Sequence, residues 1–407
     1  MRSTIGAMTN QSFIRNMNQR RILTLLRREG GLSRAEIARR LSLTRSAVTY
    51  LADALLTEKL VIEAPAGDRP VRDAGRPGVA LSLNPTGHYF LGVEIGVTAM
   101  RFALVDMTLM PARTKTINLR KPPKPAEAIQ AIDGFFKESA AEKPFRGRIR
   151  AIGVTVPGLV SNDGLVLHLP ILGWRAVNFL ALAKRTFRLP IAIENDTNAV
   201  AFGEVYRQPK LSHDLVLFLK LGNGCGGAAV IDGNLLRGTG GVATEFGHMR
   251  VADGGPQCPC GQTGCLETRV NLAALARYLA EERSSLAAEP EQVARAIATG
   301  DVAARAAMAR LEAWLAIGMI NLVNIFNPSD IVLGGAMRPI LALCLESLRE
   351  RVTAGIVAGI KPPKIALSRD DAYECAVGAA TIAHHEQFDA TALSVGNGGH
   401  EITAFRR

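Results

Sequence analysis

From Tyr89 onward, short apolar runs alternate with glycine-containing turns and helical stretches. This alternation is typical of α/β folds, in which helices cover a sheet, and it leaves few other fold classes open. In these folds ligand sites lie at the carboxyl ends of strands, and the chain is predicted to contain two such halves. Five segments are predicted to carry the strands: 89–106, which holds two strands around a turn, 148–160, 190–205, 215–233 and 330–337. Within 190–205 a loop is expected to open a helix at Thr197, and a helical region at 272–326 separates the last two segments.

The first 84 residues have a helical pattern instead. Residues 18–28 carry apolar side chains at helical spacing and are followed by two glycines. Ser33 is predicted to cap a second helix, with Glu36 at the capping-box position, and Thr44 is predicted to cap a third. Two short helices, a tight turn and a third helix with polar groups at its start indicate a helix-turn-helix, whose third helix enters the major groove of DNA.

Two strands, at 61–63 and 79–83, are predicted to flank a long polar loop and form a wing. An arginine held in this loop by glycine and proline suits a narrow minor groove. The alternative is a small helical domain used for protein contacts. The residues predicted to contact DNA are Arg34, Arg45, Ser46, Thr49, Tyr50 and Arg76.

The positive charge is concentrated in this N-terminal part. Residues 1–84 hold 14 Lys and Arg against 7 Asp and Glu, whereas the rest of the chain holds 34 against 30. A basic small domain beside a near-neutral large one indicates a polyanionic partner, most often nucleic acid, although a solvated basic face has the same composition. Hydrophobic residues make up 48% and charged residues 21%, which excludes disorder as the main state.

Four residues have the spacing of metal ligands. His248, Cys258, Cys260 and Cys265 form the pattern H-x9-C-x-C-x4-C. Three thiolates and one imidazole suit a tetrahedral zinc ion, and a site with no open position is structural. We therefore expect one structural zinc per chain, the alternative being four unconnected residues. The remaining cysteines stand among apolar or small residues and are expected to be buried and inert: Cys225, Cys344 and Cys375.

The segment 245–267, EFGHMRVADGGPQCPCGQTGCLE, resembles the ROK family of repressors, open reading frames and sugar kinases. The segment 194–204, ENDTNAVAFGE, is similar to the family's sugar-binding and catalytic loop. Together with the helix-turn-helix, the resemblance extends to the repressor branch. It implies an actin-like ATPase fold of two α/β lobes with sugar in the cleft. The expected domains are 1–84 for DNA binding, 85–200 and 201–390 for the two lobes, and 391–407 as a tail.

The resemblance also implies which residues contact the sugar. His248 would have one ring nitrogen on zinc and the other facing sugar. In the family's kinases Asp196 is the presumptive base; here it is a vestigial candidate, and the alternative is a helix N-cap. Carboxylates, an amide and an imidazole bind the hydroxyl groups of a sugar in pairs. The implied sugar contacts are Gly158, Asn195, Asp196, Glu245, His248 and Glu267.

Two phosphate motifs depart from the family pattern. The first, typically D-x-G-G-T, has Glu94 in place of the aspartate and Val97, whose side chain is expected to crowd a phosphate. The second, typically L-G-T-G-x-G-G-G, has Asn223 and Ala228; its glycines suit either a phosphate or a tight turn. The adenosine-side motif survives at 332–336. This asymmetry predicts a kinase fold that keeps sugar recognition and has lost, or nearly lost, phosphoryl transfer.

The sequence thus favours a sugar-responsive transcriptional repressor that is not an enzyme. It would bind double-stranded operator DNA as a homodimer or tetramer and respond to a sugar or sugar phosphate. Two alternatives stay open: an ATP-dependent sugar kinase with an accessory DNA-binding domain, and a regulator controlled by a protein partner. The predicted location is the cytoplasm, with no membrane association, because neither a secretory h-region nor about 18 unbroken apolar residues occur.

Overall fold

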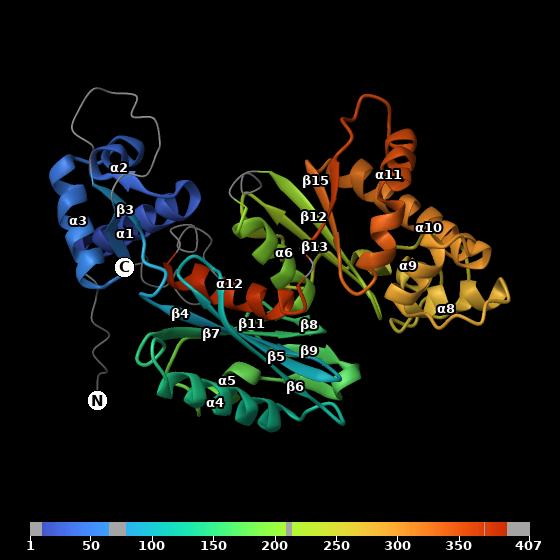
Figure 1. Cartoon of the computed structure of the whole chain (residues 1–407), viewed down its shortest axis with the longest axis horizontal. Helices are drawn as coiled ribbons and strands as arrows, with labels where there is room; N and C mark the ends of the chain where they lie inside the picture. The colour runs from blue at the N-terminus through green and yellow to red at the C-terminus, as the bar shows by residue number, and fades with distance from the viewer. Residues whose placement is uncertain (1–9, 65–78, 209–213, 370, 389–407) are drawn as a thin grey trace. The chain divides into compact units, whose positions relative to one another are not determined.

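The computed structural model describes residues 10–64, 79–208, 214–369 and 371–388. Their packing divides the chain into two units (Figure 1). Unit 1 comprises the described residues up to Asp196 and, from Cys375, the C-terminal helix α12 (Glu374–Phe388); unit 2 runs from Thr197 to Glu374. The division therefore differs from the expected lobes, because α12 packs in unit 1 and not in the second lobe. The wing loop with Arg76 and the tail at 391–407 lie outside the described residues.

Three helices form the body of the N-terminal part: α1 (Asn10–Glu29), α2 (Arg34–Leu41) and α3 (Arg45–Thr57). The last two begin where predicted, because Ser33 and Thr44 accept hydrogen bonds from backbone N–H groups in the first turns. The Glu36 carboxylate accepts from the Ser33 N–H and so completes the capping box. α1 starts at Asn10, earlier than the predicted start at residue 18.

Strands β1 (Leu32–Ser33), β3 (Ala80–Leu83) and β2 (Val61–Ala64) form an antiparallel sheet in that order. β2 and β3 are the two predicted wing strands. β1 was not predicted, because two residues are too short to show an alternating pattern. The winged helix-turn-helix is thereby confirmed, around a core of Ile22, Leu26, Ile37, Val48 and Leu81.

Unit 1 also contains a five-stranded sheet of order β11-β7-β4-β5-β6. β7 and β11 pair in parallel, while β4, β5 and β6 form an antiparallel meander. The strands are β4 (Tyr89–Ile95), β5 (Ala99–Asp106), β6 (Pro111–Asn118), β7 (Ile149–Val156) and β11 (Ile191–Asn195). Helices α4 (Pro125–Ala141) and α5 (Phe179–Ala183) cover one face of it (Figure 1). A small sheet of β8 (Leu159–Val160), β9 (Val166–Leu169) and β10 (Trp174–Val177) completes this part.

Helix α12 covers the other face of the sheet (Figure 1). It lies unusually close because Gly92 on β4 and Gly153 on β7 are register partners. A Cβ atom on Gly92 would stand 1.8 Å from the carbonyl oxygen of Ala376, and one on Gly153 would stand 1.9 Å from that of Ala379. The paired glycines therefore form a flat strip on which the helix backbone rests.

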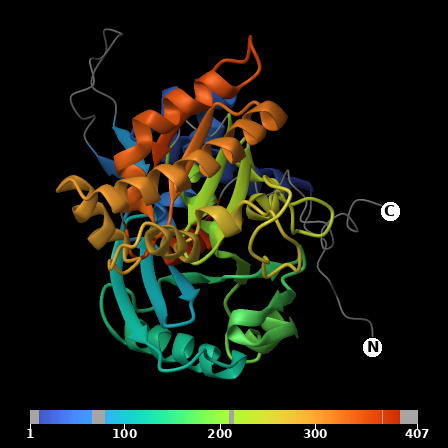
Figure 2. The same cartoon turned by 90° about the vertical axis from the view of Figure 1, so that its right-hand side faces the viewer.

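Unit 2 repeats the same sheet plan with the order β14-β13-β12-β15-β16. An antiparallel group again precedes two parallel strands, so the two predicted α/β halves are confirmed. The strands are β12 (Leu215–Leu221), β13 (Cys225–Ile231), β14 (Asn234–Leu235), β15 (Asp330–Gly334) and β16 (Lys364–Leu367). The helices are α6 (Asp196–Tyr206), α7 (Glu267–Val270), α8 (Leu272–Glu281), α9 (Pro290–Ala298), α10 (Val302–Phe326) and α11 (Arg338–Gly355). Figure 2 shows α8 to α11 (orange) gathered against one face of this sheet.

α10 is long and apolar enough to cross a membrane, judged by length and composition alone. Half of the most apolar 18-residue stretch of α10 is buried within the protein. Leu311, Leu315, Met319 and Val323 belong to the hydrophobic core of unit 2. The helix therefore has the burial of a core helix.

Candidate functional site

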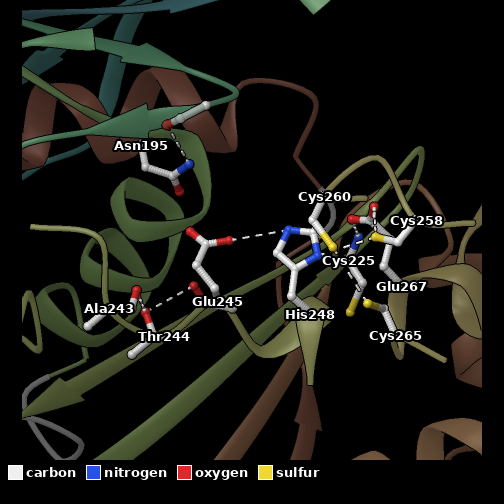
Figure 3. Close-up of polar contacts among 12 residues, drawn as sticks. Asn195, Cys225, Ala243, Thr244, Glu245, His248, Cys258, Cys260, Cys265 and Glu267 are labelled. Carbon is white, nitrogen blue, oxygen red and sulfur yellow. Dashed lines mark hydrogen bonds and ion pairs between the residues drawn. The ribbon is translucent and has the colours of Figure 1, made fainter. Parts of the chain in front are cut away.

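In unit 1, predicted site residues lie at the carboxyl ends of β7 and β11. The amide Nδ2 of Asn195 donates a hydrogen bond to the carbonyl oxygen of Gly158 at 3.1 Å (Figure 3). Gly158 has no room for a side chain, because a Cβ would stand 2.7 Å from Leu169. These two predicted sugar contacts are thus brought together.

Asp196 follows β11 directly and is the first residue of α6. The predicted loop before Thr197 is absent here, since the helix begins one residue earlier. In the first helical turn a carboxylate interacts favourably with the helix dipole. Asp196 therefore has a structural role at the start of α6, and its role toward a ligand stays a prediction.

In unit 2, Glu245 directly precedes the 3-10 turn η3 (Phe246–His248), and His248 is the last residue of that turn. The Glu245 Oε2 atom lies 3.8 Å from His248 Nε2 (Figure 3). Glu267 is the first residue of α7, and its Oε2 accepts a hydrogen bond from the backbone N–H of Cys225 at 3.0 Å. Its other oxygen lies 3.8 Å from Cys258 Sγ. Glu267 thus joins the glycine-rich hairpin to the cysteine cluster.

The four predicted metal ligands form one cluster. Their ligand atoms all lie within 4.8 Å of one another. The Sγ atoms of Cys260 and Cys265 are 3.7 Å apart, and Cys258 Sγ is 3.4 Å from His248 Nδ1 (Figure 3). When ligand atoms bind a tetrahedral ion at about 2.0–2.3 Å, the distances between one ligand atom and the next are similar to these sulfur–sulfur and sulfur–nitrogen distances. The cluster therefore has the size and the donor set to hold a metal ion.

The two ring nitrogens of His248 face different groups. Nδ1 faces Cys258 and the cluster, whereas Nε2 faces the Glu245 carboxylate. A metal on Nδ1 would fix the orientation of the ring and leave Nε2 for a ligand. The family resemblance implies the same division of roles for His248, which stays a prediction.

The cysteines of the cluster differ in their electrostatic surroundings. Burial raises the pKa of the Cys258 thiol to about 12. The backbone N–H of Gln262 lowers the pKa of the Cys260 thiol. Since metal ligation requires thiolates, a bound cation would supply the charge stabilisation that the buried Cys258 lacks.

The hairpin glycines have partners within the site. A Cβ on Gly224 would stand 2.7 Å from a Glu267 carboxylate oxygen, and one on Gly226 would stand 2.2 Å from the Thr197 hydroxyl. Gly227 likewise makes room for the carbonyl of Thr244 at 2.4 Å. Close packing, which is neither of the two uses predicted for these glycines, is therefore visible at three positions. This packing has no local signal in the sequence, because the partners are distant along the chain.

The first phosphate motif carries an internal ion pair. Glu94 on β4 and Arg101 on β5 are register partners, and Arg101 Nη1 lies 3.1 Å from Glu94 Oε2. Val97 is partly buried against the core of unit 1. Val97 therefore has a packing role, and its expected crowding of a phosphate stays a prediction.

The predicted DNA-contacting residues of α3 lie on its exposed side. Arg45, Ser46, Thr49 and Tyr50 are all exposed, and Tyr50 keeps 60% of its surface. The Arg15 guanidinium of α1 stands 5.3 Å above the Tyr50 ring. Sequence reasoning missed Arg15 because the predicted first helix began after it.

Arg34 differs from the other predicted DNA contacts. Its guanidinium lies 2.7 Å from Glu63 Oε1 and 3.4 Å from Asp53 Oδ1. It therefore ties α2 to β2 and α3, and a phosphate would compete with two carboxylates for it. These ion pairs favour a structural role for Arg34 within the domain over a DNA contact.

Comparison with known proteins identifies the family. The ROK family model matches residues 90–386, which is more than half of the chain. The chain belongs to the ROK family. A MarR family model matches residues 15–69, within the winged helix-turn-helix of this ROK protein.

Relatives of two kinds are similar to this ROK chain. The xylose repressor of Bacillus subtilis is 26% identical over 349 residues, covering 85% of this chain and 89% of the repressor. The glucokinase of Streptomyces coelicolor is 31% identical over 290 residues, covering 66% of this chain and 88% of the kinase.

Solved structures show the same two patterns. A ROK family transcriptional regulator, a homologue of the E. coli MLC protein, has a TM-score of 0.80 at 24% identity and covers 94% of this chain and 98% of its own. A ROK glucokinase from Streptomyces griseus, solved with glucose and AMPPNP, has a TM-score of 0.62 at 28% identity and covers 73% and 99%. The regulator thus matches the fold over nearly the whole chain.

Proposed function

We propose that this ROK protein is a sugar-responsive transcriptional repressor. One observation carries the proposal: its similarity to xylose repressors spans 85% of the chain. That share is larger than the ROK segment alone, whereas the glucokinase covers 66%. The comparisons therefore support the function of a regulator and not that of an enzyme.

The effector is a sugar or sugar phosphate. In unit 2 the proposed contacts are Glu245, His248 Nε2 and Glu267, which offer two carboxylates and an imidazole to vicinal hydroxyl groups. Gly158, Asn195 and Asp196 of unit 1 are proposed contacts from the family resemblance. A site built to bond hydroxyl groups discriminates strongly against analogues that lack them.

The metal of the cluster is zinc, at one ion per chain. His248, Cys258, Cys260 and Cys265 would hold it, and the donor set of one nitrogen and three sulfurs is typical of structural zinc. When bound, the ion supplies a fixed cation that neutralises the thiolates and orients the His248 ring. The cluster would then connect the stability of the loop at 248–265 to effector binding.

The ion pair of Glu94 supports the proposed loss of phosphoryl transfer. Its carboxylate is paired with Arg101, so its charge is already neutralised on the neighbouring strand. A carboxylate in this state is a weak partner for a magnesium-bound nucleotide. The ion pair supports the interpretation that the first phosphate motif no longer serves ATP.

The partner is double-stranded operator DNA, bound by the exposed start of α3 and the wing, in the cytoplasm. A homodimer, alone or paired into a tetramer, would give a pseudo-palindromic operator with half-sites one or two helical turns apart. The effector would release the DNA by favouring a conformation with lower operator affinity.

Fluorescence anisotropy with DNA from upstream of the protein's own gene tests the proposal. We expect tight binding at moderate salt and release by one member of a panel of aldoses and their phosphates, including D-xylose and D-glucose. Tight binding that no sugar changes would favour control by a protein partner. ATP-dependent phosphorylation of a sugar at about 1 s⁻¹ or faster would establish the kinase function instead.

A further inference from the structure

Thr244 adopts a backbone conformation that L-residues rarely take. Its φ angle is 67°, and it is the only β-branched residue with a positive φ among the residues that the structure describes. A β-branched side chain is particularly unfavourable in the left-handed region, because both γ atoms crowd the backbone. Such conformations persist only where their surroundings hold them, and they cluster at binding sites.

Hydrogen bonding and close packing hold Thr244 in place. Its hydroxyl oxygen lies 2.6 Å from the Ala243 carbonyl oxygen and 3.3 Å from that of Gly227, so its single proton has two acceptors (Figure 3). On Gly227 a Cβ would stand 2.4 Å from the Thr244 carbonyl oxygen and 2.5 Å from the Phe246 ring. The segment therefore fits against β13 only because residue 227 is glycine.

The conformation of Thr244 determines how the next residue is presented. The Thr244 carbonyl accepts a hydrogen bond from the Phe246 N–H at 2.7 Å. Glu245, between them, has φ −70° and ψ 58°, which are the angles of an inverse γ-turn. Glu245 thus stands at the apex of a three-residue turn that Thr244 begins, with its carboxylate 3.8 Å from His248 Nε2.

We propose that Thr244 is a positioning residue for effector recognition. Its hydroxyl and its left-handed backbone aim the Glu245 carboxylate at hydroxyl groups of the bound sugar, and Thr244 acts only through Glu245. The inference rests on the proposed function, since it requires a sugar at Glu245. A position that served folding alone would be better filled by glycine, which takes the same φ without strain.

The experiment compares Thr244→Gly, Thr244→Ser and Thr244→Val in the full zinc-loaded chain. Sugar affinity is measured by isothermal titration calorimetry with a panel of aldopentoses, aldohexoses and their phosphates, and the thermal midpoint is measured without sugar. We expect Thr244→Gly to lose at least tenfold in affinity with an unchanged or higher midpoint. Thr244→Val, which lacks the hydroxyl, should also lose affinity, whereas Thr244→Ser should stay within threefold of the wild type.

Glu245→Gln is the matched control, because it removes the charge that Thr244 aims. Unchanged affinity in Thr244→Gly, or a fall of midpoint and affinity together in that variant, would overturn the inference and leave the proposed function intact. Unchanged affinity in Glu245→Gln would also overturn it, since Thr244 would have nothing to position. A wild type that binds no sugar of the panel would overturn the inference and the proposed function together.

Discussion

At His88, burial and the neighbouring Arg150 guanidinium lower the imidazole pKa from its ordinary value near 6.5 to about 4. Below pH 6.5 His88 is protonated in the unfolded chain, whereas in the folded chain it stays neutral until the pH falls to about 4. Its contribution to stability is therefore present above pH 6.5 and is lost as the pH falls toward 4. We expect the free energy of unfolding to be lower at pH 5 than at pH 7 by up to about 2 kcal/mol from this residue. Urea unfolding at both pH values measures it, and a His88→Gln variant that kept the full pH dependence would assign the effect elsewhere.

Burial also separates the cysteines into two classes. It raises the pKa of the Cys225 and Cys344 thiols to about 12, so neither forms a thiolate at pH 8. With metal bound we expect iodoacetamide to leave both unmodified in the folded chain. A chelator should then open Cys260 to alkylation, because it is exposed and its thiol pKa is lowered, and leave the buried Cys225 and Cys344 protected. Peptide mass spectrometry identifies the modified residues, and early modification of Cys344 in the folded chain would contradict its burial.

Arg45 of α3 and Arg34 of α2 allow a matched comparison. We expect Arg45→Ala to weaken operator binding about tenfold and to reduce the salt slope by about 1, because an exposed cation at the start of the helix reaches the DNA backbone. Arg34→Ala should leave the salt slope unchanged, since its guanidinium is paired with Glu63 and Asp53. Anisotropy titrations at several salt concentrations separate the two. Equal salt slopes in Arg45→Ala and the wild type would remove Arg45 from the interface.

In the sheet of unit 1, Gly153 tests how closely α12 lies. An alanine there would place its Cβ 1.9 Å from the Ala379 carbonyl oxygen, so we expect Gly153→Ala to lower the free energy of unfolding by about 2–3 kcal/mol. Gly134 in α4 is the control, because no atom lies within 4 Å of a Cβ there. Gly134→Ala should stabilise the protein by about 0.5–1 kcal/mol through helix propensity. Denaturant unfolding of both variants gives the comparison, and equal values would contradict the close approach.

Sequence reasoning missed β6 and the start of α1 for the same physical reason. β6 is a polar edge strand with alternating partial burial, and its sequence PARTKTIN has little apolar periodicity. The start of α1, NQSFIRNM, is likewise mostly polar. By contrast, the capped helices and the apolar strands were predicted correctly, because caps and runs of apolar residues are local signals.

For the whole molecule, the metal cluster was recognisable because its ligands lie within 18 residues and have a characteristic spacing. The contacts of Glu267 with Cys225 and of Gly227 with Thr244 were not, because they join segments distant in sequence. The same holds for α12, whose place in unit 1 depends on two glycines more than 200 residues earlier. The spacing of residues therefore predicts a metal site within one loop, whereas contacts between distant segments depend on tertiary packing.

Loss of the metal tests the proposed zinc site and its effect on the whole molecule. We expect elemental analysis to find about one zinc per chain. Cys260→Ser should reduce metal content, thermal stability and effector response, while operator affinity without effector stays within about threefold, because the cluster belongs to unit 2 and the helix-turn-helix to unit 1. Elemental analysis, thermal unfolding and anisotropy are run on the same preparation. An equal loss of operator affinity without effector would contradict this separation.

The position of α12 also affects how the chain folds during synthesis. Unit 2 is one continuous segment and can complete its core before α12 has left the ribosome. Unit 1 cannot, because the face of its sheet at Gly92 and Gly153 stays uncovered until α12 has emerged. A nascent or truncated chain that ends before α12 therefore presents an apolar surface of the kind that chaperones and proteases recognise. Helix α12 thus makes quality control in the cell sensitive to whether translation has passed this segment.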